Sequence, residues 1–543
     1  QGGTSSKYSM GVYYDGVAAL GAAPVITQTG SYTIGMVLNN STGTTAGGIS
    51  LGSAADNNQV GVMAKGNSNL TIAGNISVDG DKNIGVYGES SQITANGNLS
   101  VGNSSASGNK STSSIGVSLN GGTYTGAGDI SVGDYSIGVF GKGMTAGSTI
   151  TQGTGAQTMT VGKDGLGIYG AGTGGTISAA MSSITVGTDN AIGVYAKGMD
   201  SIVTGNMNIG ANTSIGIASE GNGNVTYTGS MTIDDKGTGI NDTASVGIYK
   251  ANGAGTISTS AGNWSVGNSG YGIFLNQNAG QSAAINNNAD MNLGMSAVGI
   301  YSNGNNTVSN TGNITVGSTN VNGDHNDTTK HENSIGMYLS GGTAATSSGI
   351  ITVNHDHSVG VYGAGAGTRF TNTGIMNIDN GGVGVLVRDG AVAINEAGGN
   401  INLGGTLASS GGKTVGMAAY TGATIENRGT ITVNEGIGML VGNQANLINR
   451  GTIHVNNGTG IEGAGNITNT GNIVVTGTGK KEETSGLTAA RVGAVIIQPD
   501  GTIKINDKYT AIGGTLSTAG NIVVNGAYVD ATTKTPLFNA HSV

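Results

Sequence analysis

Short apolar segments with a glycine at a fixed place recur along the whole chain. In NAIGVYAKG (190–198), Gly193 lies between two β-branched residues, and polar residues flank the segment. Side chains alternate between the two faces of a strand, so each such segment predicts a short strand with one buried face. The glycine of the motif recurs at Gly11, Gly35, Gly61, Gly85, Gly116, Gly138, Gly167, Gly193, Gly216, Gly247, Gly272, Gly299, Gly336, Gly360, Gly384, Gly416, Gly438, Gly460, Gly493 and Gly513.

Each repeat contains two further apolar segments. One reads Gly-Asn/Thr-Ile-x-Val, and a weaker Thr/Ile segment precedes it, as at 91–97 and 423–429. Three short segments of period two, separated by Gly/Asn turns and without helical periodicity, predict one coil of a parallel β-helix. We therefore expect an all-β solenoid of about 20 coils with about 26 residues per coil. It is expected to run as a single continuous segment over residues 1–543.

The alternation also predicts which side chains face inward. In AIGVY (191–195), Ile192 and Val194 are expected inside, while Gly193 and Tyr195 face solvent. A tyrosine ring would then cover the glycine of a neighbouring coil. This outer column either keeps the face flat or forms a docking face for carbohydrate or protein. Its tyrosines are Tyr13, Tyr87, Tyr169, Tyr195, Tyr249, Tyr301, Tyr338 and Tyr362.

Composition supports a folded chain and excludes several functional classes. Gly 104 with Pro 3 and only 9% charged residues is unlike a disordered Gly-rich segment. The absence of cysteine excludes disulfides and thiolate metal sites. A net charge of −9, with no arginine before Arg369, argues against nucleic-acid binding. No segment resembles a membrane span or an export signal, so we expect any signal or anchor to lie outside this sequence.

The repeat units resemble a known family. SIGVFGKG (136–143), AIGVYAKG (191–198) and SVGVYGAG (358–365), with GNISVDG (74–80) and GDISVGD (128–134), are similar to the passenger repeats of large fusobacterial type V autotransporter adhesins, the RadD-like group. The resemblance implies a right-handed β-helix on the bacterial cell surface and no enzymatic activity. It also implies coaggregation with other bacteria, attachment to host cells, and a cationic, arginine-like competitor.

The family's partners are surface proteins or glycans of other bacteria and host cells. The family also anchors its passenger through a C-terminal outer-membrane barrel. No alternating barrel strands are present at residues 535–543, so we expect a passenger segment whose only membrane link is a barrel absent from this chain. The resemblance implies no cofactor. Two alternatives stay open: a β-helical polysaccharide-degrading enzyme, or a structural stalk that presents a more distal binding domain.

Long insertions mark one turn of the coil. They follow the Gly-Asn/Thr-Ile-x-Val segment and precede the glycine motif, so they are expected to project from one edge. This loop edge is either a binding surface or a turn that merely tolerates insertions. The insertions lie near 103–114, 234–244, 318–333, 404–413 and 476–486.

The same turn collects acidic residues, including Asp79, Asp81, Asp134, Asp164 and Asp189. Turn chemistry explains many of them, but a stacked strip of carboxylates would also attract cationic ligands. The candidate ligand-binding residues on the loop edge are Asp234, Asp235, Asp324, Asp327, Glu332, Asp356, Glu482 and Glu483.

Four of the six histidines fall on this turn in two successive coils. With the neighbouring carboxylates they form a nitrogen and oxygen ligand set suited to zinc or nickel, and they are His325, His331, His355 and His357. A solvated polar loop is the competing interpretation, because a metal site needs supporting contacts around its ligands.

Catalytic signatures are missing from the sequence, which contains no G-x-S-x-G, H-E-x-x-H or Walker motif. Asp379 and Asp389 near Arg388 are the one acid and base grouping that we nominate for an enzyme. Arg428 and Arg450, each in an Asn-Arg-Gly turn, are expected to lie one coil apart, where they hold an anion or are simply solvated.

Overall fold

The computed structural model describes residues 9–20, 24–45, 47–52, 57–105, 112–236, 243–317, 334–355, 357–404 and 413–475, and beyond these the strands β52 to β58. The described chain is a parallel β-solenoid of about 16 turns with about 25 residues per turn. The predicted fold class is therefore confirmed, with fewer turns than the 20 glycine motifs indicated. Two of those motifs, at Gly493 and Gly513, lie outside the described residues. None of the described residues forms a helix of the length and apolarity that a membrane span requires.

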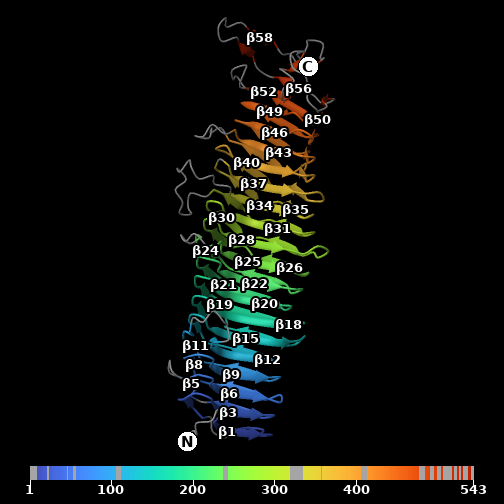
Figure 1. The fold of residues 1–543 in the computed structure, drawn as a ribbon. Helices are drawn as coiled ribbons and strands as arrows, with labels where there is room; N and C mark the ends of the chain where they lie inside the picture. The colour runs from blue at the N-terminus through green and yellow to red at the C-terminus, as the bar shows by residue number, and fades with distance from the viewer. Residues whose placement is uncertain are drawn as a thin grey trace. The chain divides into compact units, whose positions relative to one another are not determined.

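The chain divides into two compact units. Unit 1 contains Gln1–Trp264 and Gly270–Phe274, and unit 2 contains Ser265–Ser269 and Leu275–Val543. In each unit a standard turn has three strands. The strand with the glycine motif belongs to sheet A, and the second and third strands of the turn belong to sheet B. Within each unit, equivalent strands of successive turns lie side by side (Figure 1).

In unit 1 the strands of sheet A are β1 (Ser9–Asp15), β3 (Thr33–Asn39), β6 (Val60–Lys65), β9 (Ile84–Glu89), β12 (Ile115–Asn120), β15 (Ile137–Met144), β18 (Leu166–Gly172), β20 (Ile192–Lys197), β22 (Ile215–Glu220) and β25 (Val246–Ala251). The second strands are β4 (Thr42–Thr45), β7 (Asn69–Ile72), β10 (Gln92–Ala95), β13 (Thr123–Gly126), β16 (Thr149–Gln152), β23 (Val225–Thr228) and β26 (Thr256–Thr259). The third strands are β2 (Ile26–Gln28), β5 (Ile49–Leu51), β8 (Ile76–Val78), β11 (Leu99–Val101), β14 (Ile130–Val132), β17 (Thr158–Val161) and β24 (Met231–Ile233). Second and third strands merge in β19 (Thr176–Val186) and β21 (Asp200–Ile209).

In unit 2 the strands of sheet A are β31 (Val298–Asn303), β34 (Ile335–Ser340), β37 (Val359–Ala364), β40 (Val383–Arg388), β43 (Val415–Ala419), β46 (Ile437–Val441), β49 (Gly458–Gly463) and β52 (Thr484–Ala489). The second strands are β29 (Ala284–Asn287), β32 (Thr307–Asn310), β35 (Ala344–Ser347), β38 (Arg369–Asn372), β41 (Val392–Asn395), β44 (Thr424–Asn427), β47 (Asn446–Asn449) and β50 (Asn466–Asn469). The third strands are β30 (Asp290–Leu293), β33 (Ile314–Val316), β36 (Ile350–Val353), β39 (Ile375–Ile378), β42 (Asn400–Leu403), β45 (Thr430–Val433), β48 (Thr452–Val455) and β51 (Asn472–Val475).

Strands β27 (Asn263–Val266) and β28 (Tyr271–Asn276) continue the same pattern. Later in the chain, β55 (Leu516–Thr518) and β56 (Ile522–Val524) pair in parallel with β50 and β51. Two antiparallel pairs depart from the pattern, β53 (Val495–Ile497) with β54 (Ile503–Ile505) and β57 (Ala527–Val529) with β58 (Pro536–Asn539).

The glycine column corrects one prediction. Val194 is fully buried as expected, but Gly193 is buried too, and Ile192 is only half-buried. A Cβ on Gly193 would lie 2.7 Å from the carbonyl oxygen of Gly216 and 3.0 Å from Cγ2 of Val186, which belongs to sheet B. The glycine therefore faces the interior, where the two sheets approach too closely for a side chain. Strict alternation fails at this position because Gly193 and Val194 are both inside, and it resumes at Tyr195.

A Gly384→Ala substitution tests this close approach. Its Cβ would lie 2.5 Å from the carbonyl oxygen of Gly416 and 3.0 Å from Cδ1 of Ile378. We expect the free energy of unfolding to fall by about 1–3 kcal/mol, as in other overpacked cores. Gly398→Ala is the control, since the nearest atom lies at 3.9 Å and the residue is exposed. Equal stability of both variants in chemical denaturation would contradict the inward orientation of the motif glycine.

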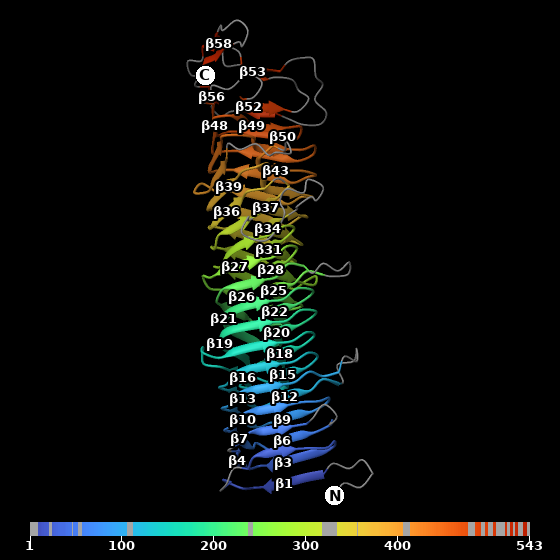
Figure 2. The ribbon, with the colours of Figure 1, turned by 90° about the vertical axis from the view of Figure 1, so that its left-hand side faces the viewer.

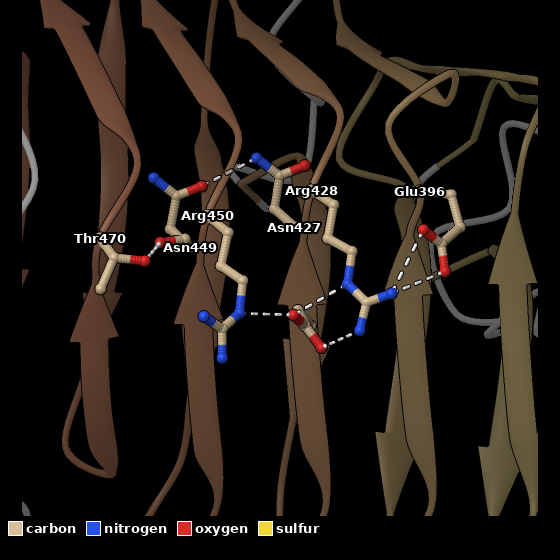
Figure 3. A network of polar contacts seen from close by, with 7 residues as sticks. Glu396, Asn427, Arg428, Asn449, Arg450 and Thr470 are labelled. Carbon is tan, nitrogen blue, oxygen red and sulfur yellow. Dashed lines mark hydrogen bonds and ion pairs between the residues drawn. The ribbon is translucent and has the colours of Figure 1, made fainter.

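Polar side chains inside unit 2 form a ladder of asparagines. Asn372, Asn395, Asn427, Asn449 and Asn469 occupy the same position in successive turns, and none is more than 1% exposed. Each Nδ2 donates to the Oδ1 of the next residue in the ladder, at 2.7–2.9 Å. Figure 3 shows the Asn427 to Asn449 step. The ladder supplies each buried amide with the partner that burial requires.

Asn427→Ala interrupts the ladder and leaves Asn395 and Asn449 each without one hydrogen-bond partner. Because both remain buried, we expect a loss of about 2–4 kcal/mol in the free energy of unfolding. Asn402→Ala removes a comparable inter-turn bond, to Asn377 at 3.0 Å, at a half-exposed site. That control is expected to change stability by less than about 0.5 kcal/mol. Urea unfolding measures the stability of both variants. Equal losses in Asn427→Ala and Asn402→Ala would show that burial of the ladder does not strengthen its contribution.

Candidate functional site

Each insertion of the predicted loop edge begins after a third strand of the turn and ends before a strand of sheet A. In unit 1, the insertions near 103–114 and 234–244 leave β11 and β24 and return to β12 and β25. In unit 2, those near 318–333, 404–413 and 476–486 leave β33, β42 and β51 and return to β34, β43 and β52. Because equivalent strands are in register, the described ends of these insertions lie at one corner of the turn within each unit. The central parts of the insertions lie outside the described residues.

Few of the predicted ligand residues fall where the structure describes side chains. Asp234 and Asp235 follow β24 directly, and the pKa of Asp234 is raised, first by desolvation and then by the charge of Asp235. The others, Asp324, Asp327, Glu332, Asp356, Glu482 and Glu483, lie outside the described residues.

Of the predicted metal ligands, His355 and His357 are described. A Cβ added to Gly317 would come within 2.6 Å of Cδ2 of His355, so this ring packs against the backbone of the preceding turn. His357 has a φ of 58° and is exposed. His325 and His331 lie outside the described residues. Among the described residues, no group of three His, Cys, Asp or Glu is placed to hold a metal ion.

Many carboxylates of the acidic turns bind the next turn of the solenoid. Oδ1 of Asp81 accepts a hydrogen bond from the backbone N–H of Ser105 at 2.6 Å, and Oδ1 of Asp134 accepts from Lys163 N–H at 2.9 Å. Asp189 accepts from Asn212 and forms an ion pair with Lys163, and both contacts lower its pKa. These acids therefore stabilise the contact between turns, as turn chemistry predicted, and the charge of Asp189 is partly neutralised by Lys163.

The Asn-Arg-Gly turns form a compact ion-pair network (Figure 3). Arg428 donates Nε and Nη2 to the two carboxylate oxygens of Glu426, at 2.9 and 3.0 Å, and Nη1 to Glu396 at 3.0 Å. Arg450 donates Nε to Glu426 at 2.8 Å. Glu426 is largely buried, and its pKa is lowered, first by the hydrogen bond from Arg428. Two guanidinium groups thus pair with two carboxylates, so the network has no net charge. It lacks the excess positive charge that the anion site considered in the sequence analysis would need.

The acid and base grouping nominated for an enzyme lies at strand ends and turns, with Arg388 as the last residue of β40. Arg388 donates Nε to Asp389 at 2.8 Å, and both side chains are exposed. Oδ1 of Asp379 accepts from the adjacent Asn380 N–H at 2.9 Å.

The outer face of sheet A carries the predicted aromatic column. Rings stack along it, with centroids 4.9 Å apart for Phe140 and Tyr169, and 5.0 Å apart for Tyr301 and Tyr338. Stacked rings cover one another's faces and leave their edges to solvent. A bare glycine strip between them is absent, because the glycines face inward. The prediction that a tyrosine of this column covers a motif glycine is therefore wrong, because the two face opposite sides of sheet A.

Lys250 is a buried charge that the sequence analysis did not single out. Its ammonium group donates to the carbonyl oxygens of Gly221 and Gly223, at 2.9 and 2.7 Å, and its side chain is fully buried. Burial lowers its pKa to about 8. The signal was present in the alternation, because Lys250 follows the outward Tyr249 and occupies the inward position held by Ala196 in β20.

This lowered pKa makes stability depend on pH in a defined direction. The folded chain gives up the Lys250 proton near pH 8, but the unfolded chain keeps it to about pH 10.5. Folding stability therefore rises with pH between these values. We expect the free energy of unfolding of the wild type, minus that of Lys250→Met, to increase over this range in urea titrations. A constant difference would contradict the burial of the charge.

Comparison with known proteins finds no matching family model, no similar curated protein and no similar solved structure. The fold and the local geometry therefore carry the functional argument.

Proposed function

We propose that this chain is a passenger segment of a bacterial cell-surface adhesin and that the loop edge is its attachment surface. The observation that carries the proposal is the repeated departure of long insertions from the same corner of the turn in each unit. In other coils the same corner is a short turn whose acids bind the next turn, as in the Asp81, Asp134 and Asp189 contacts. Loops held by a rigid scaffold are where binding residues usually lie.

The proposed partners are surface proteins or glycans of other bacteria and of host cells. Weak contacts at several loops would add through avidity, because the loops belong to one chain and those of one unit leave the same corner of its turns. Carboxylates such as Asp234 and Asp235 would attract a cationic, arginine-like competitor to this edge. The stalk alternative is supported by a different observation, the use of turn carboxylates such as Asp81 and Asp134, and of buried strand amides such as Asn395, in bonds between turns.

Deletion of 318–333 and of 476–483, which stops short of β52, tests the loop edge. Beads coated with the purified chain are expected to lose at least about tenfold of their attachment to partner bacteria when both loops are removed, since avidity multiplies the two losses. Asp234→Lys with Asp235→Lys should abolish inhibition by free arginine. The control removes 154–156, an exposed turn between β16 and β17 on another side of the coil. Unchanged attachment after both deletions and the charge reversal would refute the loop edge and favour a stalk.

A further inference from the structure

The outer face of sheet B in unit 1 carries a regular array of uncharged polar side chains on β4, β7, β10, β13, β16 and β19. Figure 2 shows the first five of these strands side by side. Each strand contributes two outward positions separated by one inward residue. We call the set the threonine array; it consists of Thr42, Thr44, Asn69, Thr71, Gln92, Thr94, Thr123, Thr125, Thr149, Thr151, Thr176 and Ser178.

The array is held in register by the core beneath it. Thr94 is paired directly with Thr71 on one side and Thr125 on the other, and Thr125 is paired with Thr151. Neighbouring strands lie about 4.8 Å apart, and the two outward positions of one strand are about 6.6 Å apart. The inward residues between them, including Ile93 and Ile150, are at most 1% exposed. Buried side chains therefore fix the backbone, and through it the spacing of the hydroxyl groups.

The polar groups of the array are available. All twelve side chains are exposed or half-exposed, and within the described part of the chain none of them forms a hydrogen bond to the protein. This distinguishes them from the turn residues Asp81 and Asp134, which bond the next turn. A rigid lattice of free donors and acceptors can bind a ligand with little loss of conformational entropy, because β-branched threonines are already restricted.

The array is also uncharged, and this narrows the class of ligand. The run is interrupted at β21, where Asp200 and the exposed Ile202 take the two outward positions. Uncharged polar residues return at Thr226 of β23 and at Thr256 and Ser258 of β26. In unit 2, Thr307 and Ser309 of β32 keep the pattern, and Arg369, Ile394 and Glu426 break it from β38 to β44. An acidic polymer would need cationic side chains, and a protein partner would need apolar anchors. Threonine hydroxyl groups can hydrogen-bond to the hydroxyl groups of a neutral chain of sugars, and the adjacent methyl groups can contact the C–H faces of its rings.

We propose that the threonine array binds a neutral, extended polysaccharide, whose hydroxyl groups hydrogen-bond to successive turns of unit 1. The site is separate from the loop edge. This proposal rests on the proposed adhesin function in one respect only, that a cell-surface chain would encounter such a polymer. Each contact is weak, and binding arises from their number.

The test uses the full chain and a panel of insoluble neutral polysaccharides: β-1,4-glucan, α-1,3-glucan, chitin and mannan. We expect retention on at least one of them, insensitive to salt because no charges take part. The triple variant Thr94→Val, Thr125→Val and Thr151→Val keeps shape and strand preference but removes three hydroxyl groups. Its retention should fall at least tenfold. The control is Thr346→Val with Thr371→Val, at the same outward column in the broken pattern of unit 2.

Several outcomes decide the proposal. Retention of the triple variant equal to that of the wild type, failure to bind any of the four polymers, or binding that falls steeply with salt would each overturn it. Urea unfolding of the triple variant checks that the fold is intact, and Thr125→Lys, which adds a charge at the centre, provides a second variant that should also fail to bind. The loop deletions should leave polysaccharide retention unchanged, so failure of the adhesin proposal and failure of this one are distinguishable.

Discussion

The close approach of the two sheets at the glycine column is the constraint on which the rest of the structure depends. Glycine in a strand costs backbone entropy and contributes no packing, so its recurrence needs a compensating gain. Here the vacant Cβ position is occupied by branched side chains of sheet B, such as Val186 against Gly193 and Ile378 against Gly384. The interior is therefore thin, and mainly aliphatic side chains with few aromatic ones fill it. Burial per turn is modest, and stability comes from repetition.

A thin core leaves many backbone and side-chain polar groups to be satisfied between turns. The buried asparagine ladder does this inside unit 2, and the side chains of Asp81 and Asp134 do it at the turns. The Arg428 and Glu426 network serves the same purpose, because charges from neighbouring turns neutralise one another there. Polar residues that the sequence offered as binding candidates are thus often part of the scaffold, and a residue type alone does not mark a site.

The sequence predicted the fold class, the three strands per standard turn and the corner from which the insertions leave, because period and spacing determine all three. It placed Ile192 and Gly193 on the wrong faces, since alternation was extended through a position where two consecutive residues turn inward. It identified the Asn-Arg-Gly turns but not the ladder, because the amide-to-amide bonds join residues 20 to 32 positions apart. The histidine and acidic loop candidates lie mostly beyond the described residues, so their chemistry stays a prediction.

Stacking constrains the inward positions of this solenoid far more than the outward ones. Inward, each turn must match its neighbours in size and in hydrogen bonding, as Asn395 and Asn427 do. Outward, a side chain need only keep strand geometry, so differences between turns at outward positions are not required by the fold. The outward positions of the threonine array are polar and uncharged in six successive turns, from β4 to β19, whereas those from β38 to β44 in unit 2 include Arg369, Ile394 and Glu426. A regular pattern at outward positions is not required by packing, so it indicates a binding surface more strongly than a regular pattern at inward positions does.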